Sequence, residues 1–139
     1  MFKNILVALD GSEHAMKAAR IAREMAICLK ADLWVVVAYD PLPSYLGDPV
    51  FQKAITKRLS HSEEILHSGL QEIGQVPGRV KTEILEGPPA EAILSVAETR
   101  NMDLIIMGTR GLGMLAGMLV GSQSQKVVAH AGCPVLLVR

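Results

Sequence analysis

The stretch that decides the fold runs from Lys3 to Asp40, KNILVALDGSEHAMKAARIAREMAICLKADLWVVVAYD. Its opening, KNILVALD, is short, β-branched and almost continuously apolar, which predicts a strand buried on both faces. The DGS that follows indicates a turn and the start of a helix, with Ser12 as the N-cap. A second apolar segment, from Leu33 to Tyr39, predicts another buried strand.

The helix predicted between these strands carries small side chains on one face. Alanine recurs there at helical spacing together with Met25 and Leu29, whereas Lys, Arg and Glu occupy the opposite face. Small side chains let a helix lie close to a sheet. We expect Cys28, which lies beside Ile27 and Leu29, to belong to the same core.

The remaining chain continues the alternation of strands and helices. A long helix is predicted from about Val50 to Ile73, with Ile55, Leu59, Ile65, Leu66 and Leu70 inward. After it come an edge strand (RVKTEILEG), a helix opened by proline (PPAEAILSVAETRN), a buried strand (DLIIMG), a helix (SQSQKVVAHA) and a last strand (CPVLLVR). Five strands and four helices predict an α/β fold, with an open parallel sheet covered by helices on both faces.

Composition limits the classes of protein to consider. A chain of 139 residues suits one domain with a real core, and we expect residues 1–139 to form it. Lys plus Arg and Asp plus Glu balance at 14 each, which gives no bulk argument for nucleic acid or an anionic membrane. No apolar stretch approaches the length of a membrane span, no signal peptide is recognised, and the two cysteines form no CxxC. These features predict a cytoplasmic protein.

An unusual segment, GTRGLGMLAGMLVGSQSQ, occupies Gly108 to Gln125. Gly108 and Gly111 follow the fourth predicted strand, where backbone without a side chain can approach a ligand closely. Gly121 and Ser122 open the last predicted helix, where free N–H groups and the positive end of the helix dipole favour an anion. The segment therefore predicts a site for phosphate groups.

The side chains around this segment agree with an anionic ligand. No acidic residue follows Asp103, and Arg110 and Lys126 are the charged residues nearby. GLGMLA, which begins at Gly111, matches the dinucleotide pattern GxGxxA, but it follows the fourth strand and no acidic residue lies downstream to hold a ribose. No lysine stands between Gly121 and the hydroxyl residue, so a P-loop is excluded and the machinery for fast phosphoryl transfer is incomplete.

These residues resemble a known family. The pattern of Gly108, two residues, Gly111, nine residues and then Gly121–Ser122 is similar to the nucleotide-binding signature of the universal stress proteins. The beginning, NILVALDGSEHAMKA, and the end, AHAGCPVLLVR, resemble the same family, so the resemblance covers essentially the whole chain. It implies a five-stranded parallel sheet in strand order 3-2-1-4-5, and it implies the branch of the family that binds ATP.

The resemblance also implies roles for residues at matching positions. The ribose and phosphates would meet the glycine motif, the adenine would meet the end of the second strand, and Mg or Mn would be held through the phosphates. With Arg110 included as the cation within the segment, the predicted site consists of Ala8, Asp10, Ala38, Gly108, Arg110, Gly111, Gly121, Ser122, Gln123 and Ser124. Family members pair their last strands, which implies a homodimer through Pro134 to Val138.

Three functions compete at this point. The first is an ATP-binding stress-response sensor or effector in which the nucleotide is a ligand and hydrolysis is slow or absent. The second is a protein-interaction module without nucleotide, whose partner surface is LGMLAGMLV, residues 112–120. The third is an enzyme for small molecules, which is weaker because no catalytic triad or Cys/His pair lies near the predicted crevice.

We read His14, His61, His67 and His130 as surface residues without ligand spacing, and we expect no structural metal. Asp10 is interpreted either as a turn cap or as a nucleotide contact.

Overall fold

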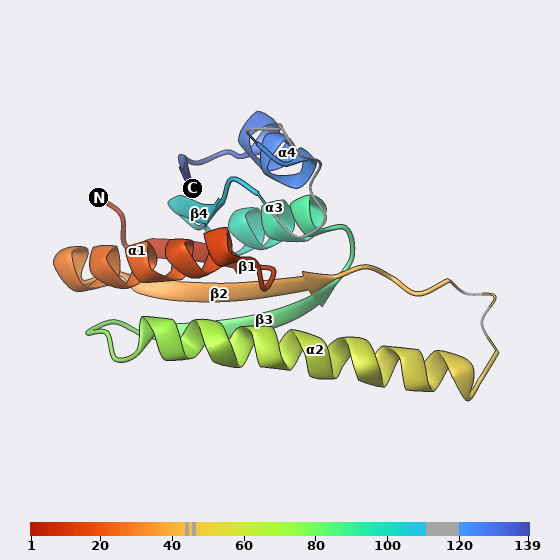
Figure 1. The fold of residues 1–139 in the computed structure, drawn as a ribbon. Helices are drawn as coiled ribbons and strands as arrows, with labels where there is room; N and C mark the ends of the chain where they lie inside the picture. Colours follow the sequence, from red (N-terminus) through yellow and green to blue (C-terminus); the bar gives the residue numbers. More distant parts are fainter. Residues whose placement is uncertain (44, 46, 111–119) are drawn as a thin grey trace.

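The fold alternates strands and helices along the whole chain (Figure 1). The computed structural model describes residues 1–43, 45, 47–110 and 120–139. The elements are, in order, β1 (Asn4–Leu9), α1 (Glu13–Leu29), β2 (Asp32–Tyr39), α2 (Val50–Ile73), β3 (Val80–Glu86), α3 (Pro89–Thr99), β4 (Leu104–Gly108), α4 (Ser122–His130) and β5 (Val135–Val138).

All strand pairs are parallel, and the sheet has the order β3-β2-β1-β4-β5. This confirms the predicted α/β class and strand order. β1 lies in the middle, with Leu6 opposite Trp34 of β2 on one side and opposite Ile105 of β4 on the other. Side chains of β1 are buried on both faces, as the continuous apolar run predicted; Ile5, Leu6 and Val7 are fully buried. Burial of each such side chain stabilises the fold by about 1.5–3 kcal/mol.

The two faces of the sheet have separate cores. α1 and α2 cover one face, where Ile5, Val7 and Leu9 of β1 pack against the buried alanines of α1. These alanines, called the alanine stripe below, are Ala15, Ala18, Ala19, Ala22 and Ala26. α3 and α4 cover the other face, through side chains such as Ile93 and Val127. Ser12 is the N-cap of α1 as predicted, and its side chain accepts a hydrogen bond from the amide of Ala15 at 3.2 Å.

The prediction that Cys28 and Leu29 belong to the core is wrong. Cys28 is exposed, and 44% of Leu29 is exposed. On a helix, Cys28 lies about 200° around the axis from Ala26, which faces the sheet. Lys30 then adopts the left-handed conformation (φ 54°) and turns the chain into the sheet, so the next buried position belongs to Ala31.

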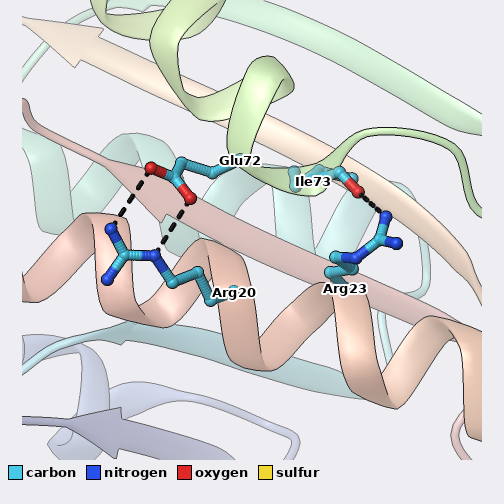
Figure 2. Close-up of polar contacts among 4 residues, drawn as sticks. All are labelled: Arg20, Arg23, Glu72 and Ile73. Atoms are coloured by element: carbon cyan, nitrogen blue, oxygen red, sulfur yellow. Dashed lines mark hydrogen bonds and ion pairs between the residues drawn. The ribbon is translucent and has the colours of Figure 1, made fainter.

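Polar contacts hold α1 against the end of α2. Arg20 donates to both carboxylate oxygens of Glu72, at 2.9 and 3.2 Å. Arg23 donates to the carbonyl of Ile73, and both contacts are drawn in Figure 2. The predicted bounds of α2 are confirmed, and its first turns extend past the ends of the neighbouring strands (Figure 1). No helix of the described residues combines the length and apolar character that crossing a membrane requires.

Candidate functional site

A cavity of about 400 Å³ lies at the carboxyl edge of the sheet, beside β1. β1 pairs with β2 on one side and β4 on the other, so the strand order reverses here, which is where open α/β sheets bind ligands. Three strand ends and the first turns of α1, α3 and α4 form its walls, through Ala8, Leu9, Asp10, Ala15, Val36, Ala38, Asp40, Pro89, Ile93, Met107, Gly108 and residues 121–124.

The structure brings most of the predicted site residues together on this cavity. Those that line it are Ala8, Asp10, Ala38, Gly108, Gly121, Ser122, Gln123 and Ser124. Arg110 is described but does not line the cavity; its carbonyl accepts a hydrogen bond from the hydroxyl of Ser12 at 3.3 Å. Gly111 lies outside the described residues, as does most of the segment 112–120.

The start of α4 presents backbone donors to the cavity. Gly121 is the N-cap, with extended backbone (φ −69°, ψ 159°), and its carbonyl accepts from the amide of Gln125 at 3.0 Å. Within the described part of the chain, the amides of residues 122, 123 and 124 have no acceptor. Free amides and the helix dipole together stabilise an anion at such a helix start.

The three side chains at the start of α4 have different tasks. The buried Ser124 hydroxyl donates to the carbonyl of Gly108 at 2.9 Å, which fixes α4 to β4. The side-chain carbonyl of Gln123 accepts from the amide of Ala90 at 3.0 Å and so caps α3. Ser122 is exposed at the cavity. Ser124 is therefore engaged with Gly108, whereas the Ser122 hydroxyl has no partner among the described residues and can turn toward a ligand.

Gly108 allows a close approach between helix and strand. A Cβ at this position would lie 2.8 Å from Cβ and 3.0 Å from the carbonyl carbon of His14. The sequence predicted close approach of a ligand at Gly108, but the structure gives this glycine a packing role as well. α1 could not lie so near β4 if the residue carried a side chain.

Thr109 is a site-supporting residue that the sequence analysis missed. Its amide donates to Val138 at 2.8 Å, and its carbonyl accepts from the amide of Gly121 at 2.7 Å, which brings both ends of the intervening segment together. Its hydroxyl lies 3.0 Å from Nδ1 of His14. His14 is thus half-buried and bonded, not a surface histidine as predicted, whereas His61, His67 and His130 are exposed.

Two carboxylates stand at the mouth of the cavity. Oδ1 of Asp10 accepts from the amide of Ser12 at 2.9 Å, so Asp10 does cap the turn, and its exposed side chain also lines the cavity. Asp40, which follows β2, was missed. The signal was present, because Asp40 ends its strand as Asp10 ends β1, and carboxyl ends of parallel strands share one edge.

Two further features of the described residues bear on the chemistry open to this chain: the state of Cys133 and the grouping of possible metal ligands. Burial, with a smaller contribution from the charge of Asp103, raises the pKa of the Cys133 thiol and disfavours the thiolate that a nucleophile needs. Cys133 is half-buried at the entry to β5. In the ranges that the structure describes, no three His, Cys, Asp or Glu side chains are grouped as metal ligands.

Comparison with known proteins places this cavity in context. The profile described as the universal stress protein family matches residues 1–139. A universal stress protein encoded in the QAH/OAS sulfhydrylase 3′ region of Thermus aquaticus is 52% identical over 139 residues, and the match covers 100% of both chains.

Solved structures share the same architecture. Universal stress protein UspA from Lactobacillus plantarum superposes with a TM-score of 0.89 at 29% identity, over 99% of this chain and 98% of that one. The universal stress protein from Archaeoglobus fulgidus, solved in complex with dAMP, has a TM-score of 0.75 at 20% identity, over 100% and 98% of the two chains. The fold, the full-length profile match and the relative at 52% identity agree: this chain belongs to the universal stress protein family.

Proposed function

We propose that the cavity at the carboxyl edge binds ATP, as the ligand of a homodimeric stress-response sensor or effector formed by one domain, residues 1–139. The observation that carries the proposal is the convergence of two features on one cavity. The amides at the start of α4, which have no acceptor among the described residues, line the same cavity as apolar side chains such as Val36, Ala38 and Ile93. A purine needs apolar surface and a phosphate needs donors, and this cavity offers both.

Each part of the nucleotide finds fitting residues. Ala38 and Ala8, at the ends of β2 and β1, leave room for the adenine and ribose, and Asp10 offers a carboxylate oxygen to the ribose hydroxyls. The amides of residues 122–124 and the Ser122 hydroxyl would receive the phosphates. A phosphate-bound Mg or Mn would be recruited by the nucleotide and partly neutralise its charge, with Asp10 and Asp40 at the same opening.

The structure of the dAMP complex from Archaeoglobus fulgidus supports an adenine nucleotide as the ligand class. That protein shares the fold at 20% identity, so the choice of ATP rests on the cavity of this chain. We infer slow or absent hydrolysis, because no lysine stands between Gly121 and Ser122 where a P-loop would have one.

The proposed dimer uses the outer edge of β5. This strand pairs with β4 on one side and ends the sheet, and Leu136 is 36% exposed on it. An edge strand with exposed apolar side chains favours pairing with a second copy. The cytoplasm is the proposed compartment, and an unidentified protein partner would receive the signal.

Isothermal titration calorimetry with ATP, ADP, AMP and cyclic AMP tests the proposal, together with identification of any nucleotide released when purified protein is denatured. Saturable binding of ATP with one site per chain is expected. If none of the four nucleotides binds, the proposal fails. The alternative, an interaction module without nucleotide, then gains support if a partner binds through residues 112–120 and loses it when that run is replaced by a glycine–serine linker.

A further inference from the structure

A second cavity, of about 200 Å³, lies at the opposite edge of the sheet. Asp32 and Trp34 at the beginning of β2 line it, with Arg79 and Lys81 at the beginning of β3 and Arg100 after α3. This is the amino edge, so the cavity is separate from the candidate nucleotide site, and the two share no lining residue.

Positive side chains dominate this second cavity. Arg79, Lys81 and Arg100 line it, against one lining carboxylate, Asp32. Oδ1 of Asp32 already accepts from the backbone amide of Arg79 at 2.8 Å. Two further carboxylates lie nearby: Glu83 is 3.3 Å from Arg100, and Asp103 accepts from the amides of Lys3 and Asn4.

The three cations differ in whether they pair with a carboxylate. Within the described part of the chain, neither Arg79 nor Lys81 forms an ion pair, whereas Arg100 pairs with Glu83. The ammonium of Lys81 and the guanidinium of Arg100 both lie 5.0 Å from the centre of the Trp34 ring, within the range of cation–π attraction. The indole therefore gathers two positive charges at the cavity without neutralising them.

Trp34 also has an unsatisfied hydrogen-bond donor in the described structure. Its Nε1 is buried, and no acceptor lies within hydrogen-bond distance of it in the described structure. A buried donor without a partner destabilises the folded state, because it has given up its hydrogen bond to water. Among the side chains that line this cavity, hydrogen-bond donors outnumber acceptors. A ligand that complements them would bring oxygen lone pairs and negative charge.

We propose that this cavity is a second ligand site, which binds a small anion through phosphate or carboxylate oxygens. Arg79, Lys81 and Arg100 supply the charge, and the indole N–H supplies a directed donor. The side chains of Lys81 and Arg100 are exposed, so they can swing from the ring toward the anion. Cation–π packing alone would account for Lys81 and Arg100, but not for Arg79 or the unpartnered N–H.

The chain offers a direct probe, because Trp34 is its one tryptophan. Titrating the full-length protein with inorganic phosphate, and separately with succinate, at constant ionic strength in chloride should give a saturable change in tryptophan fluorescence. Saturation with phosphate alone identifies a phosphate ligand, saturation with succinate alone a carboxylate ligand, and saturation with both a general anion site. Failure of both anions to exceed the chloride control overturns the proposal.

Variants separate a specific site from general charge. Lys81→Met and Arg79→Gln should each weaken binding of the anion at least tenfold, whereas Lys57→Gln, at an exposed position of α2, should leave the affinity unchanged. Trp34→Phe, followed by calorimetry, should weaken it several-fold because the N–H is lost. An equal loss in the Lys57 variant, or no loss in either cavity variant, would overturn the site. The response should persist in Gly121→Leu protein; its disappearance there would assign the signal to the nucleotide cavity instead.

Discussion

The two edges of the sheet offer positive character to a ligand in different ways. At the carboxyl edge the donors are backbone amides at the start of α4, framed by small residues such as Gly108 and Gly121. At the amino edge they are long side chains, Arg79, Lys81 and Arg100, around an indole ring. A site made of backbone amides (the backbone cradle) is fixed by the fold and is lost when a larger side chain fills it. A site made of charged side chains is lost when those side chains are shortened or neutralised.

The largest effect should come from filling the backbone cradle. We expect Gly121→Leu to weaken ATP binding at least 100-fold, about 2.7 kcal/mol, because its side chain would occupy the buried entry to α4, where we propose that the phosphates bind. Calorimetry measures the change. Gly132→Leu is the matched control, since a Cβ there meets nothing within 4 Å. Ala38→Phe tests the proposed adenine end of the cavity and should lower ATP affinity at least tenfold. Unchanged ATP affinity in both cavity variants would contradict the proposed nucleotide site.

The residues at the carboxyl edge were largely predictable because glycine and strand-end patterns are local. Ser12 could be recognised as an N-cap from its position between a strand and a helix, and the bounds of α2 followed from its apolar spacing and flanking prolines and glycines. The strand order came from the family resemblance, since the sequence of one chain does not reveal which strands are neighbours. Once β1 and β4 are adjacent, Asp10 and Gly108 must share one cavity.

What could not be predicted depends on contacts between distant segments. The amino-edge cavity joins Asn4, Trp34, Lys81 and Arg100, which form no local motif. Thr109 likewise gains its role from Val138, Gly121 and His14, which lie far from it in sequence or across an undescribed segment. The Cys28 error had another cause, because its helical angle already pointed away from the alanine stripe and only its apolar neighbours suggested burial.

The next largest effect should come from Gly108→Ala, which distinguishes a role of Gly108 in packing from a role in ligand contact. We expect Gly108→Ala to lower the free energy of unfolding by about 1–3 kcal/mol, because the methyl group would press against the backbone of His14. Urea unfolding of ligand-free protein measures this loss, and Gly132→Ala should show almost none. If Gly108→Ala left stability unchanged and reduced ATP affinity alone, the glycine would serve the ligand and not the packing of α1.

A matched pair of serines sharpens the distinction further. Ser124→Ala should cost about 1–2 kcal/mol of stability, because the buried carbonyl of Gly108 loses its donor, and should change ATP affinity little. Ser122→Ala should leave stability unchanged and weaken ATP by about 1 kcal/mol, several-fold in affinity, because an exposed hydroxyl at the phosphate end is lost. Thermal unfolding and calorimetry on both variants give the comparison, and the opposite pattern would reverse the two assigned roles.

The smallest effect belongs to a contact away from both edges, the ion pair between α1 and α2 (Figure 2). The hydrogen bond from Arg20 is the main cause that lowers the pKa of Glu72 in the folded protein; desolvation opposes it, and the charge of Arg20 adds a smaller lowering effect. A lowered folded-state pKa means that the stabilisation is fully present above the unfolded-state pKa and is lost as the pH falls through the folded-state value.

Glu72→Gln should therefore reduce stability slightly at pH 7, and the difference from the unmodified protein should shrink as the pH is lowered to about 3. Urea unfolding across this series measures it, with Glu64→Gln on the same helix as control, since Glu64 has no ion pair within the described residues. Because both side chains of the pair are open to solvent, solvent and salt screen it, and a large or pH-independent loss would mean that Glu72 packs against α1 instead of pairing with it. Such a loss would mean that the interface between α1 and α2 is stabilised by packing at Glu72, unlike the two edges of the sheet, where polar donors are the main feature.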